Sequence, residues 1–230
     1  MKGLYLVTDR FLCESAGNTV EDVILQAVQG GASYVQLREK SLSTRAFIEE
    51  ARIVKEILKP YGVPLIINDR VDVALAVGAE GVHVGQSDMP YNLARGLMGP
   101  EALIGVSVET WDDVQQAEAC DCDYIGVSPL FKTPTKTDTK GDWGLEGLKR
   151  IRAFSRRRLV AIGGINKGNA ADIVAAGADC IAVVSALCCA VDPCMAAEEL
   201  TEIVRTGLEK RTAARPENAR WRRENGKKPS

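Results

Sequence analysis

Short apolar runs recur about every 20 to 30 residues along the chain, and each run ends in glycine, polar or charged residues. The runs are continuous rather than alternating, which is typical of parallel β-strands that are covered on both faces. Eight strands are therefore expected, namely Leu4–Val7, Tyr34–Leu37, Leu65–Ile67, Gly81–Val84, Leu103–Val106, Tyr124–Val127, Leu159–Ile162 and Cys180–Val184.

Helical periodicity fills the segments between these runs. After the second strand, apolar residues from Phe47 to Leu58 fall on one stripe, and Ser43 and Thr44 precede it as capping residues. Eight strands that alternate with helices predict an α/β fold, a (β/α)8 TIM barrel with right-handed crossovers. A doubly wound open sheet is the alternative.

Composition and charge divide the chain into two parts. The 230 residues are 46% hydrophobic and 26% charged, which suits one domain with a large core. We expect the barrel to occupy residues 1–207. Residues 208–230 hold eight Lys or Arg against three Asp or Glu, so we expect a basic, largely disordered tail.

The same composition limits location and partners. The apolar runs are far shorter than the roughly 20 residues that cross a bilayer, and no signal peptide fits before Thr8, so a cytoplasmic protein is predicted. Seven cysteines without CxxC spacing and a single histidine predict reduced thiols and no zinc site. We expect small-molecule partners, no membrane and no nucleic acid, although Trp221 among arginines offers stacking with charge. A homo-oligomer is compatible with the sequence.

Polar residues end nearly every expected strand. Catalytic groups of a barrel lie at the carboxyl ends of its strands, so these residues should be read together. In chain order they are Thr8-Asp9-Arg10, Gln36-Leu37-Arg38-Glu39-Lys40, Asn68-Asp69-Arg70, Gly85-Gln86-Ser87-Asp88, Ser107, Thr133-Pro134-Thr135-Lys136-Thr137, Gly163-Gly164 and Ser185.

Basic side chains follow the second strand. Gln36, Arg38 and Lys40 alternate, so a strand end would aim all three to one side. Arg38 and Lys40 suit a polyphosphate, and Gln36 can hydrogen-bond a heterocycle. Salt bridges of these cations with Glu39 or Glu49 are the alternative interpretation.

Two carboxylates, Asp69 and Asp88, follow the third and fourth strands. Beside a diphosphate they would repel it by about 4 kcal/mol per close charge pair, unless a cation bridges them. Mg²⁺ binds a few carboxylates together with phosphate oxygens, so a magnesium site is predicted. The alternative is that both aspartates cap helices.

The last two strand ends and one long loop indicate phosphate binding. Gly163-Gly164 and Val184-Ser185 are similar to the cradle that barrels form after strands seven and eight. Tight turns that need small residues are the alternative. Lys136 lies in a loop of about sixteen residues, which is typical of a lid; a flexible polar loop is the other interpretation.

Taken together, the motifs resemble the thiamine phosphate synthase family. The resemblance covers residue 3 to about residue 205 and lies in Tyr5-Leu6-Val7-Thr8-Asp9, Gln36 to Lys40, Ile67-Asn68-Asp69-Arg70, Gly81-Val82-His83-Val84-Gly85-Gln86, Thr133 to Asp138 and Ile162-Gly163-Gly164-Ile165. Two positions depart from the family's pattern: Ser128 precedes Pro129 where a glycine is expected, and Lys132 replaces a proline.

The resemblance implies a site as well as a fold. It assigns the metal ion, Mg²⁺, to Asp69 and Asp88. It assigns a pyrimidine diphosphate to Gln36, Arg38, Lys40, Asn68, Ser107 and Lys136, with Leu37 and Glu39 in the same segment. It assigns a thiazole phosphate to Thr133, Pro134, Thr135, Gly164, Val184 and Ser185. Catalytic roles fall to Arg38, Lys40, Ser107 and Lys136.

The implied reaction is loss of pyrophosphate from the pyrimidine methylene and attack by the thiazole nitrogen, which needs no general base. His83 is therefore interpreted as structural. The related thiazole tautomerases are the alternative, but they carry a histidine after strand six, where this chain has Val127-Ser128-Pro129-Leu130. A non-catalytic sensor of phosphorylated ligands is a third hypothesis, which the two aspartates disfavour.

Overall fold

Eight parallel strands close into a barrel in the computed structural model, which describes residues 1–133 and 141–213. Each strand pairs with the next one in sequence, and β1 pairs with β8. The predicted TIM barrel is confirmed, and the open sheet is wrong. The strands are β1 Gly3–Val7, β2 Tyr34–Leu37, β3 Leu65–Asn68, β4 Gly81–Val84, β5 Leu103–Val108, β6 Tyr124–Val127, β7 Arg158–Ile162 and β8 Cys180–Val183.

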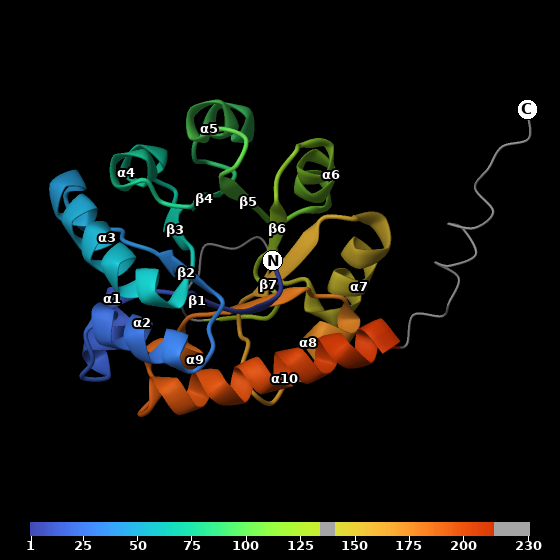
Figure 1. Ribbon diagram of the computed structural model, residues 1–230. Helices are drawn as coiled ribbons and strands as arrows, with labels where there is room; N and C mark the ends of the chain where they lie inside the picture. Colours follow the sequence, from blue (N-terminus) through green and yellow to red (C-terminus); the bar gives the residue numbers. More distant parts are fainter. Residues whose placement is uncertain (134–140, 214–230) are drawn as a thin grey trace, which may run out of the picture.

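A ring of helices surrounds the strands (Figure 1). Each crossover between strands carries at least one helix, as the alternating sequence pattern predicts. The described helices are α1 Arg10–Ser15, α2 Val20–Gln29, α3 Thr44–Leu58, the 3-10 turn η1 Lys59–Tyr61, α4 Val71–Val77, α5 Tyr91–Met98, α6 Trp111–Ala119, α7 Gly144–Phe154, α8 Ala170–Ala176, α9 Ser185–Cys188 and α10 Pro193–Ala213.

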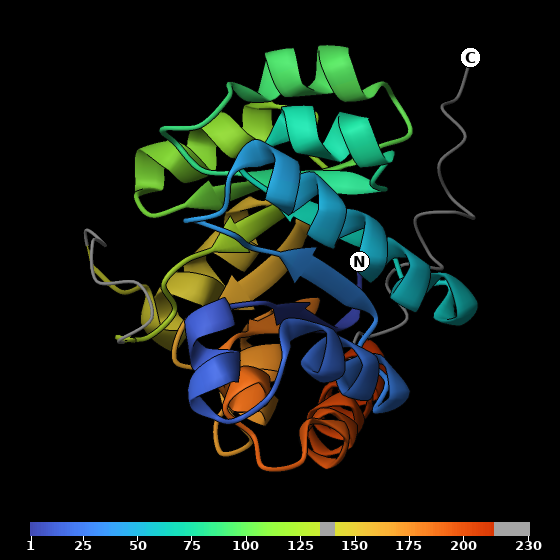
Figure 2. The same ribbon diagram turned by 90° about the vertical axis from the view of Figure 1, so that its left-hand side faces the viewer.

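Apolar side chains fill two separate layers of the barrel. The larger layer lies between the sheet and the helices, and it includes Leu4, Leu37 and Ile67. The smaller layer fills the barrel interior and includes Tyr5 and Tyr124. Both faces of each strand are therefore buried, which explains why the strands read as continuous apolar runs. Figure 2 shows α3, α4 and α5 side by side on one flank of the barrel.

The predicted capping residue of α3 is confirmed. The Ser43 hydroxyl accepts the Ala46 backbone N–H at 3.3 Å, which satisfies one of the free donors of the first turn. Thr44 is the first residue inside the helix rather than its cap. The cap fixes where α3 begins, directly after the segment that carries Arg38 and Lys40.

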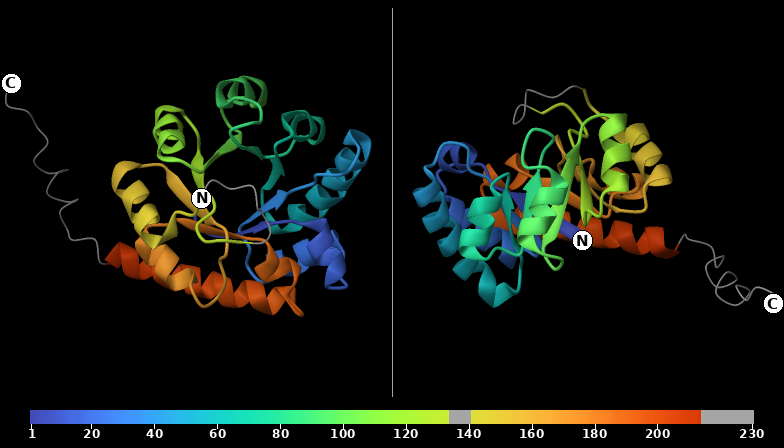
Figure 3. Two further views of the ribbon diagram at one scale, coloured as in Figure 1. Left: turned by 180° about the vertical axis from the view of Figure 1, so that it is seen from behind. Right: turned by 90° about the horizontal axis from the view of Figure 1, so that it is seen from above.

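Helix α10 extends beyond the expected end of the barrel at residue 207. It packs against α2, α8 and β1, and both views of Figure 3 show it crossing the outside of the barrel. Leu208 packs against the core, and the Arg211 guanidinium donates to the Ala178 carbonyl at 2.6 Å. Residues 208–213, which were expected in the tail, are therefore helical, because this last turn has apolar and carbonyl partners. The rest of the expected tail, 214–230, lies outside the described residues.

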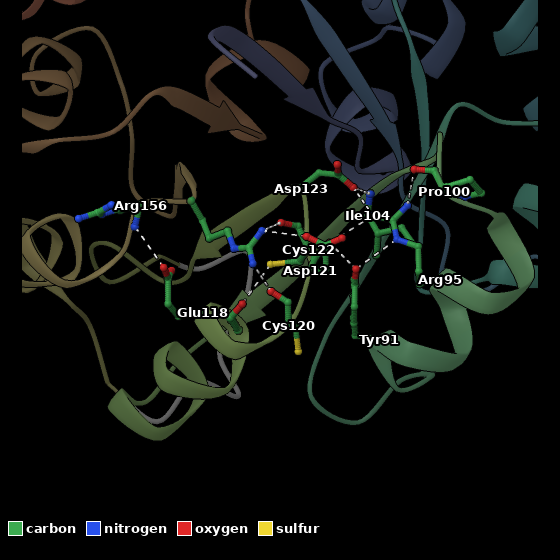
Figure 4. A network of polar contacts seen from close by, with 12 residues as sticks. Tyr91, Arg95, Pro100, Ile104, Glu118, Cys120, Asp121, Cys122, Asp123 and Arg156 are labelled. Carbon is green, nitrogen blue, oxygen red and sulfur yellow. Dashed lines mark hydrogen bonds and ion pairs between the residues drawn. The ribbon is translucent and has the colours of Figure 1, made fainter. Parts of the chain in front are cut away.

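Arginine side chains hold the loops at the amino-terminal end of the barrel (Figure 4). Arg95 donates to the Ala102 carbonyl at 2.7 Å and to Asp123 Oδ2 at 2.6 Å, and Asp123 Oδ2 also accepts the Ile104 N–H at 2.8 Å. These contacts tie α5 to the starts of β5 and β6. This end of the barrel is therefore held together by side-chain contacts. The cavity described in the next section lies at the opposite end.

The cysteines and the helices bear on the expected reduced thiols and on the expected absence of a membrane span. All seven cysteines are free thiols, and four of them are buried, as expected. Among the described residues, no helix combines the length and the apolar character needed to cross a membrane. The cytoplasmic location stays a prediction, and so does the absence of a nucleic-acid partner.

Candidate active site

A cavity of about 440 Å³ opens at the carboxyl ends of the strands, and every strand contributes to its lining. It brings together eleven of the predicted site residues: Gln36, Arg38, Lys40, Asn68, Asp69, Asp88, Ser107, Thr133, Gly164, Val184 and Ser185. Three others, Pro134, Thr135 and Lys136, lie outside the described residues. Residues from distant parts of the sequence thus converge as a parallel barrel requires.

Leu37 and Glu39 do not line this cavity. Leu37 is fully buried in the layer between the sheet and the helices. The Glu39 carboxylate accepts Arg10 Nε at 3.1 Å. Because side chains alternate along a strand, the same period that aims Arg38 and Lys40 inward aims these two outward. Neither side chain faces the cavity, so the predicted substrate contact of these two residues stays a prediction, and their backbone would have to make it.

Both cations of the second strand end have carboxylate partners at the rim of the cavity. Arg38 Nη1 donates to Asp9 Oδ2 at 3.2 Å, and Lys40 Nζ donates to Asp69 Oδ2 at 2.6 Å. Neither partner is Glu39 or Glu49, so the alternative salt bridges are wrong. The partners belong to neighbouring strand ends, which holds the two cations over the cavity.

Asp69 and Asp88 line the same cavity and lie close enough for the charge of Asp69 to act on Asp88. The pKa of Asp88 is raised, first by burial and then by the neighbouring Asp69. Asp88 Oδ2 accepts the Gly85 N–H at 2.8 Å. Neither aspartate caps a helix, because Arg70 and Pro90 occupy those cap positions. The predicted convergence of the two carboxylates is confirmed, and the capping alternative is wrong.

The backbone at Asp69 is unusual. With φ at 63°, Asp69 is the one non-glycine residue in the described ranges 1–133 and 141–213 that has a positive φ. Such a conformation costs roughly 1 kcal/mol or more in a residue with a Cβ, and it is concentrated at functional sites. The Asp69 N–H donates to the His83 carbonyl at 2.8 Å, which holds the carboxylate toward β4 and Asp88.

The donor set of this pair fits a hard divalent cation. The pKa of Asp88 is raised in part by its neighbour Asp69, and a cation between the two carboxylates would remove their mutual repulsion. No cluster of three or more His, Cys, Asp or Glu side chains arranged for a metal occurs in the described part of the chain. A cation held by this pair would therefore need further ligands, which water or the oxygens of a phosphorylated substrate supply.

Behind the second strand end, Arg10 lies between two buried carboxylates, Glu39 and Glu50. One cation cannot neutralise both, and Glu50 Oε2 has no hydrogen-bond partner among the residues that the structure describes. The pKa of Glu50 is raised to about 7, first by burial and then by Glu39. This cluster anchors the segment that presents Arg38 and Lys40, and it makes the stability of the fold depend on pH.

Replacing Glu50 by glutamine should reduce that dependence. The folded-state pKa of about 7 exceeds the usual value of 4.5, so Glu50 costs the fold nothing below pH 4.5 and destabilises it increasingly as the pH rises to 7. Relative to wild type, Glu50→Gln should gain about 2 to 3 kcal/mol of stability between pH 5 and pH 8. Urea unfolding at both pH values measures this. The exposed Glu56→Gln on α3 is the control, and an equal change in both variants would contradict the assignment.

A chain of hydrogen bonds crosses the floor of the cavity. Gln36 Nε2 donates to the Tyr5 hydroxyl at 2.9 Å, and the Tyr5 and Tyr124 hydroxyls lie 3.1 Å apart. His83 Nδ1 is 3.0 Å from the Tyr124 hydroxyl, and His83 Nε2 is 2.8 Å from Ser107 Oγ. The chain thus links two predicted substrate-binding side chains, Gln36 and Ser107. The structural interpretation of His83 is incomplete, because its ring also lines the cavity.

The two tyrosines were missed by the sequence reasoning. Tyr5 and Tyr124 lie inside strands among apolar neighbours, and an aromatic residue in such a segment is normally predicted to belong to the hydrophobic core. A signal exists in hindsight, because a buried tyrosine hydroxyl needs a partner and His83 is the chain's single histidine. Gly105 makes room for the ring, since a Cβ there would lie 2.0 Å from Tyr124 Cζ.

Tyr124→Phe should lower the free energy of unfolding by about 1 to 3 kcal/mol. The change removes the hydroxyl to which the Tyr5 hydroxyl and His83 Nδ1 are hydrogen-bonded, so both groups lose a partner inside the barrel. Chemical denaturation with urea measures the change. Tyr61→Phe removes an exposed hydroxyl and should be within about 0.5 kcal/mol of wild type. A Tyr124→Phe variant as stable as wild type would show that the chain of hydrogen bonds contributes nothing.

The ends of β7 and β8 form a narrow turn beside the cavity. Gly163 and Gly164 have φ values of 107° and 66°, and a Cβ on Gly164 would lie 2.9 Å from Phe131 Cβ. Val184 and Ser185 line the cavity next to them, where α9 begins. Glycine is thus required here by backbone conformation and by close approach, which agrees with both the predicted phosphate cradle and the tight-turn alternative.

The closed barrel and the polar cavity at its carboxyl end place the chain among the (β/α)8-barrel enzymes. A family model described as thiamine monophosphate synthase matches residues 4–187. A thiamine-phosphate synthase of Albidiferax ferrireducens is 57% identical over 201 residues, which are 87% of this chain and 91% of that protein. One of Vibrio campbellii is 50% identical over 202 residues, or 88% and 98% of the two chains. The chain therefore belongs to the thiamine monophosphate synthase family, and it is a transferase.

Solved structures agree with the sequence comparison. A thiamine phosphate pyrophosphorylase from Pyrococcus furiosus superposes with a TM-score of 0.82 at 38% identity, covering 90% of this chain and 96% of that one. A 3-hexulose-6-phosphate synthase superposes with a TM-score of 0.63 at 17% identity, covering 89% and 100% of the two chains. The second likeness shows the shared barrel alone.

Proposed function

We propose that this enzyme joins a pyrimidine methyl diphosphate to a thiazole phosphate, or to its carboxylated form, and releases pyrophosphate as thiamine phosphate forms. The observation that carries this proposal is the convergence of Lys40, Asp69 and Asp88 at one rim of the cavity, with Arg38 beside them. Cations and carboxylates that meet around one cavity suit a multiply charged anion bound together with a divalent cation.

Asp69 and Asp88 are the residues that would hold Mg²⁺. The bound ion would neutralise charge on the leaving diphosphate. Lys40 contacts Asp69 across 2.6 Å, so it lies where a diphosphate shared with the ion would also reach it. Arg38 can offer its planar guanidinium to two phosphate oxygens at once.

The floor of the cavity suits the pyrimidine ring. Gln36 and Ser107 are held at fixed positions by Tyr5 and His83, so their remaining hydrogen-bonding atoms are oriented before the heterocycle binds. Both His83 ring nitrogens are engaged, which suits an orienting role rather than proton transfer. The attacking thiazole nitrogen has a lone pair and loses no proton, so no general base is needed.

The turn at Gly163 and Gly164 with Val184 and Ser185 is proposed to bind the thiazole phosphate through backbone N–H groups. Thr133 lines the same cavity. The predicted lid contributions of Pro134, Thr135 and Lys136 stay predictions, because they fall outside the described residues.

The decisive experiment supplies both phosphorylated heterocycles and measures thiamine phosphate with and without EDTA. We expect turnover with Mg²⁺, loss of at least about 100-fold with EDTA, and recovery when Mg²⁺ is added in excess. Formation of thiamine phosphate at an undiminished rate in EDTA would remove the role of the two aspartates. Isomerisation of a thiazole phosphate carboxylate without any thiamine phosphate would favour the tautomerase alternative.

A further inference from the structure

A second hollow, of about 690 Å³, lies at the amino-terminal end of the barrel, opposite the candidate active site. Its lining comes from the residues next to β1, β7 and β8 and from the ends of α7 and α10. Five of its lining residues are basic and one is acidic: Lys2, Arg152, Arg156, Arg158 and Arg211 against Asp179. The described lining therefore carries a net of four positive charges.

The single carboxylate is already fully engaged. Asp179 Oδ2 accepts Arg152 Nη1 at 3.1 Å and the Leu159 N–H at 3.0 Å. Asp179 Oδ1 accepts Arg211 Nη2 at 2.6 Å. With two guanidinium groups and a backbone donor on it, this buried carboxylate has little capacity to neutralise the other three cations.

Lys2, Arg156 and Arg158 form no ion pair with an acidic side chain of residues 1–133 or 141–213. Arg156 has Glu118 close by, but it is the Arg156 backbone N–H that donates to Glu118 Oε1, at 3.4 Å. Figure 4 shows the Arg156 side chain extending away from that carboxylate. Like charges gathered around a hollow repel one another unless an anion lies between them.

We propose that this hollow is a second anion site that binds a compact phosphate compound with two or more phosphoryl groups, of which inorganic pyrophosphate is the simplest. Two arginines in the lining, Arg156 and Arg158, offer planar donor groups that match phosphate oxygens, and Lys2 adds a third cation. The net charge of the lining is of the same size as that of such an anion and opposite in sign.

The arrangement favours a compact anion over a nucleic acid. The cations converge on one hollow from several elements, whereas a nucleic acid needs a stripe of cations that follows its phosphates. Glu118 lies at the edge of the hollow, where it accepts the Ser155 hydroxyl, and its negative charge limits the basic surface on that side. The proposal is independent of the reaction assigned to the other end of the barrel.

Titration calorimetry of the full chain with pyrophosphate, in the presence of the Mg²⁺ that the Asp69 and Asp88 pair needs to hold a diphosphate, tests the site. We expect two sites in the wild type. Arg156→Glu combined with Arg158→Glu should weaken one of them at least about tenfold. The charge-matched control, Arg52→Glu with Lys59→Glu on α3 and η1, should keep both. Arg38→Ala should keep the site at the amino-terminal end and weaken the other.

Turnover and a competitor complete the test. The Arg156→Glu, Arg158→Glu variant should keep turnover within about twofold of wild type, because neither residue lines the active-site cavity, and this also shows that it folds. A single wild-type site that keeps its affinity in the double variant would overturn the proposal. So would two sites of unchanged affinity in the double variant, which would assign the binding to residues 214–230 or elsewhere. Tighter binding of a single-stranded oligonucleotide, lost in the same variant, would assign the hollow to nucleic acid instead.

Discussion

Asp69→Asn should lower kcat by about 100- to 1000-fold at saturating Mg²⁺ while the fold survives. The change removes one negative charge from the pair with Asp88, so the remaining carboxylate holds a divalent cation poorly. Asparagine is the substitution of choice because the backbone at position 69 has φ at 63°, and asparagine tolerates that conformation better than alanine. Lys40 would lose its ion-pair partner at the same time.

The measurement is steady-state turnover over a range of Mg²⁺ concentrations, with circular dichroism to verify the fold. Asp121→Asn is a matched control, because its carboxylate is 92% exposed and pairs with Arg157 at the other end of the barrel. It should retain wild-type turnover. A normal kcat for Asp69→Asn at saturating Mg²⁺ would refute the role of the carboxylate pair.

Arg38→Ala should lower kcat/KM for the pyrimidine diphosphate by at least about 100-fold, which corresponds to about 2.7 kcal/mol of lost transition-state stabilisation. The guanidinium lines the cavity and can meet two phosphate oxygens. Arg38→Lys should recover only part of the loss, because a lysine keeps the charge and lacks the planar pair of donors.

The ion pair of Arg38 with Asp9 requires a second variant, since Arg38→Ala also leaves Asp9 without a cation beside the cavity. If that uncompensated carboxylate caused the loss by repelling substrate, Asp9→Asn in the same chain would restore activity. We expect no such restoration. Arg52→Ala on the exposed face of α3 should have no effect on the same assay, and a similar loss there would point to a general effect of charge.

The apolar runs and their spacing were sufficient for the fold class. Continuous runs such as Leu65–Ile67 are buried on both faces, and a closed parallel barrel is the arrangement that buries eight of them in succession. The same reasoning located the cavity, because all parallel strands end at one rim. Element boundaries were less well predicted: β5 runs to Val108, so Ser107 lies within a strand rather than after it.

Side-chain alternation and the family motif predict different sets of cavity residues at the second strand end. It placed Gln36, Arg38 and Lys40 on one side, and it required Leu37 and Glu39 to face the other side, yet the family motif carried all five into the site. The end of the barrel at residue 207 came from charge alone. Charge could not show that Arg211 finds the Ala178 carbonyl and Asp179 as partners.

By itself, the sequence determined the barrel, the rim on which its polar residues meet and the family, because periodicity and local motifs act over short stretches of chain. Only the tertiary structure decided that Asp69 and Asp88 meet at one cavity, that Tyr5, Tyr124 and His83 connect Gln36 to Ser107, and that five cations and one carboxylate line a hollow at the far end. Each of these depends on distances between side chains far apart in sequence, which are set by barrel closure and the packing of neighbouring strands.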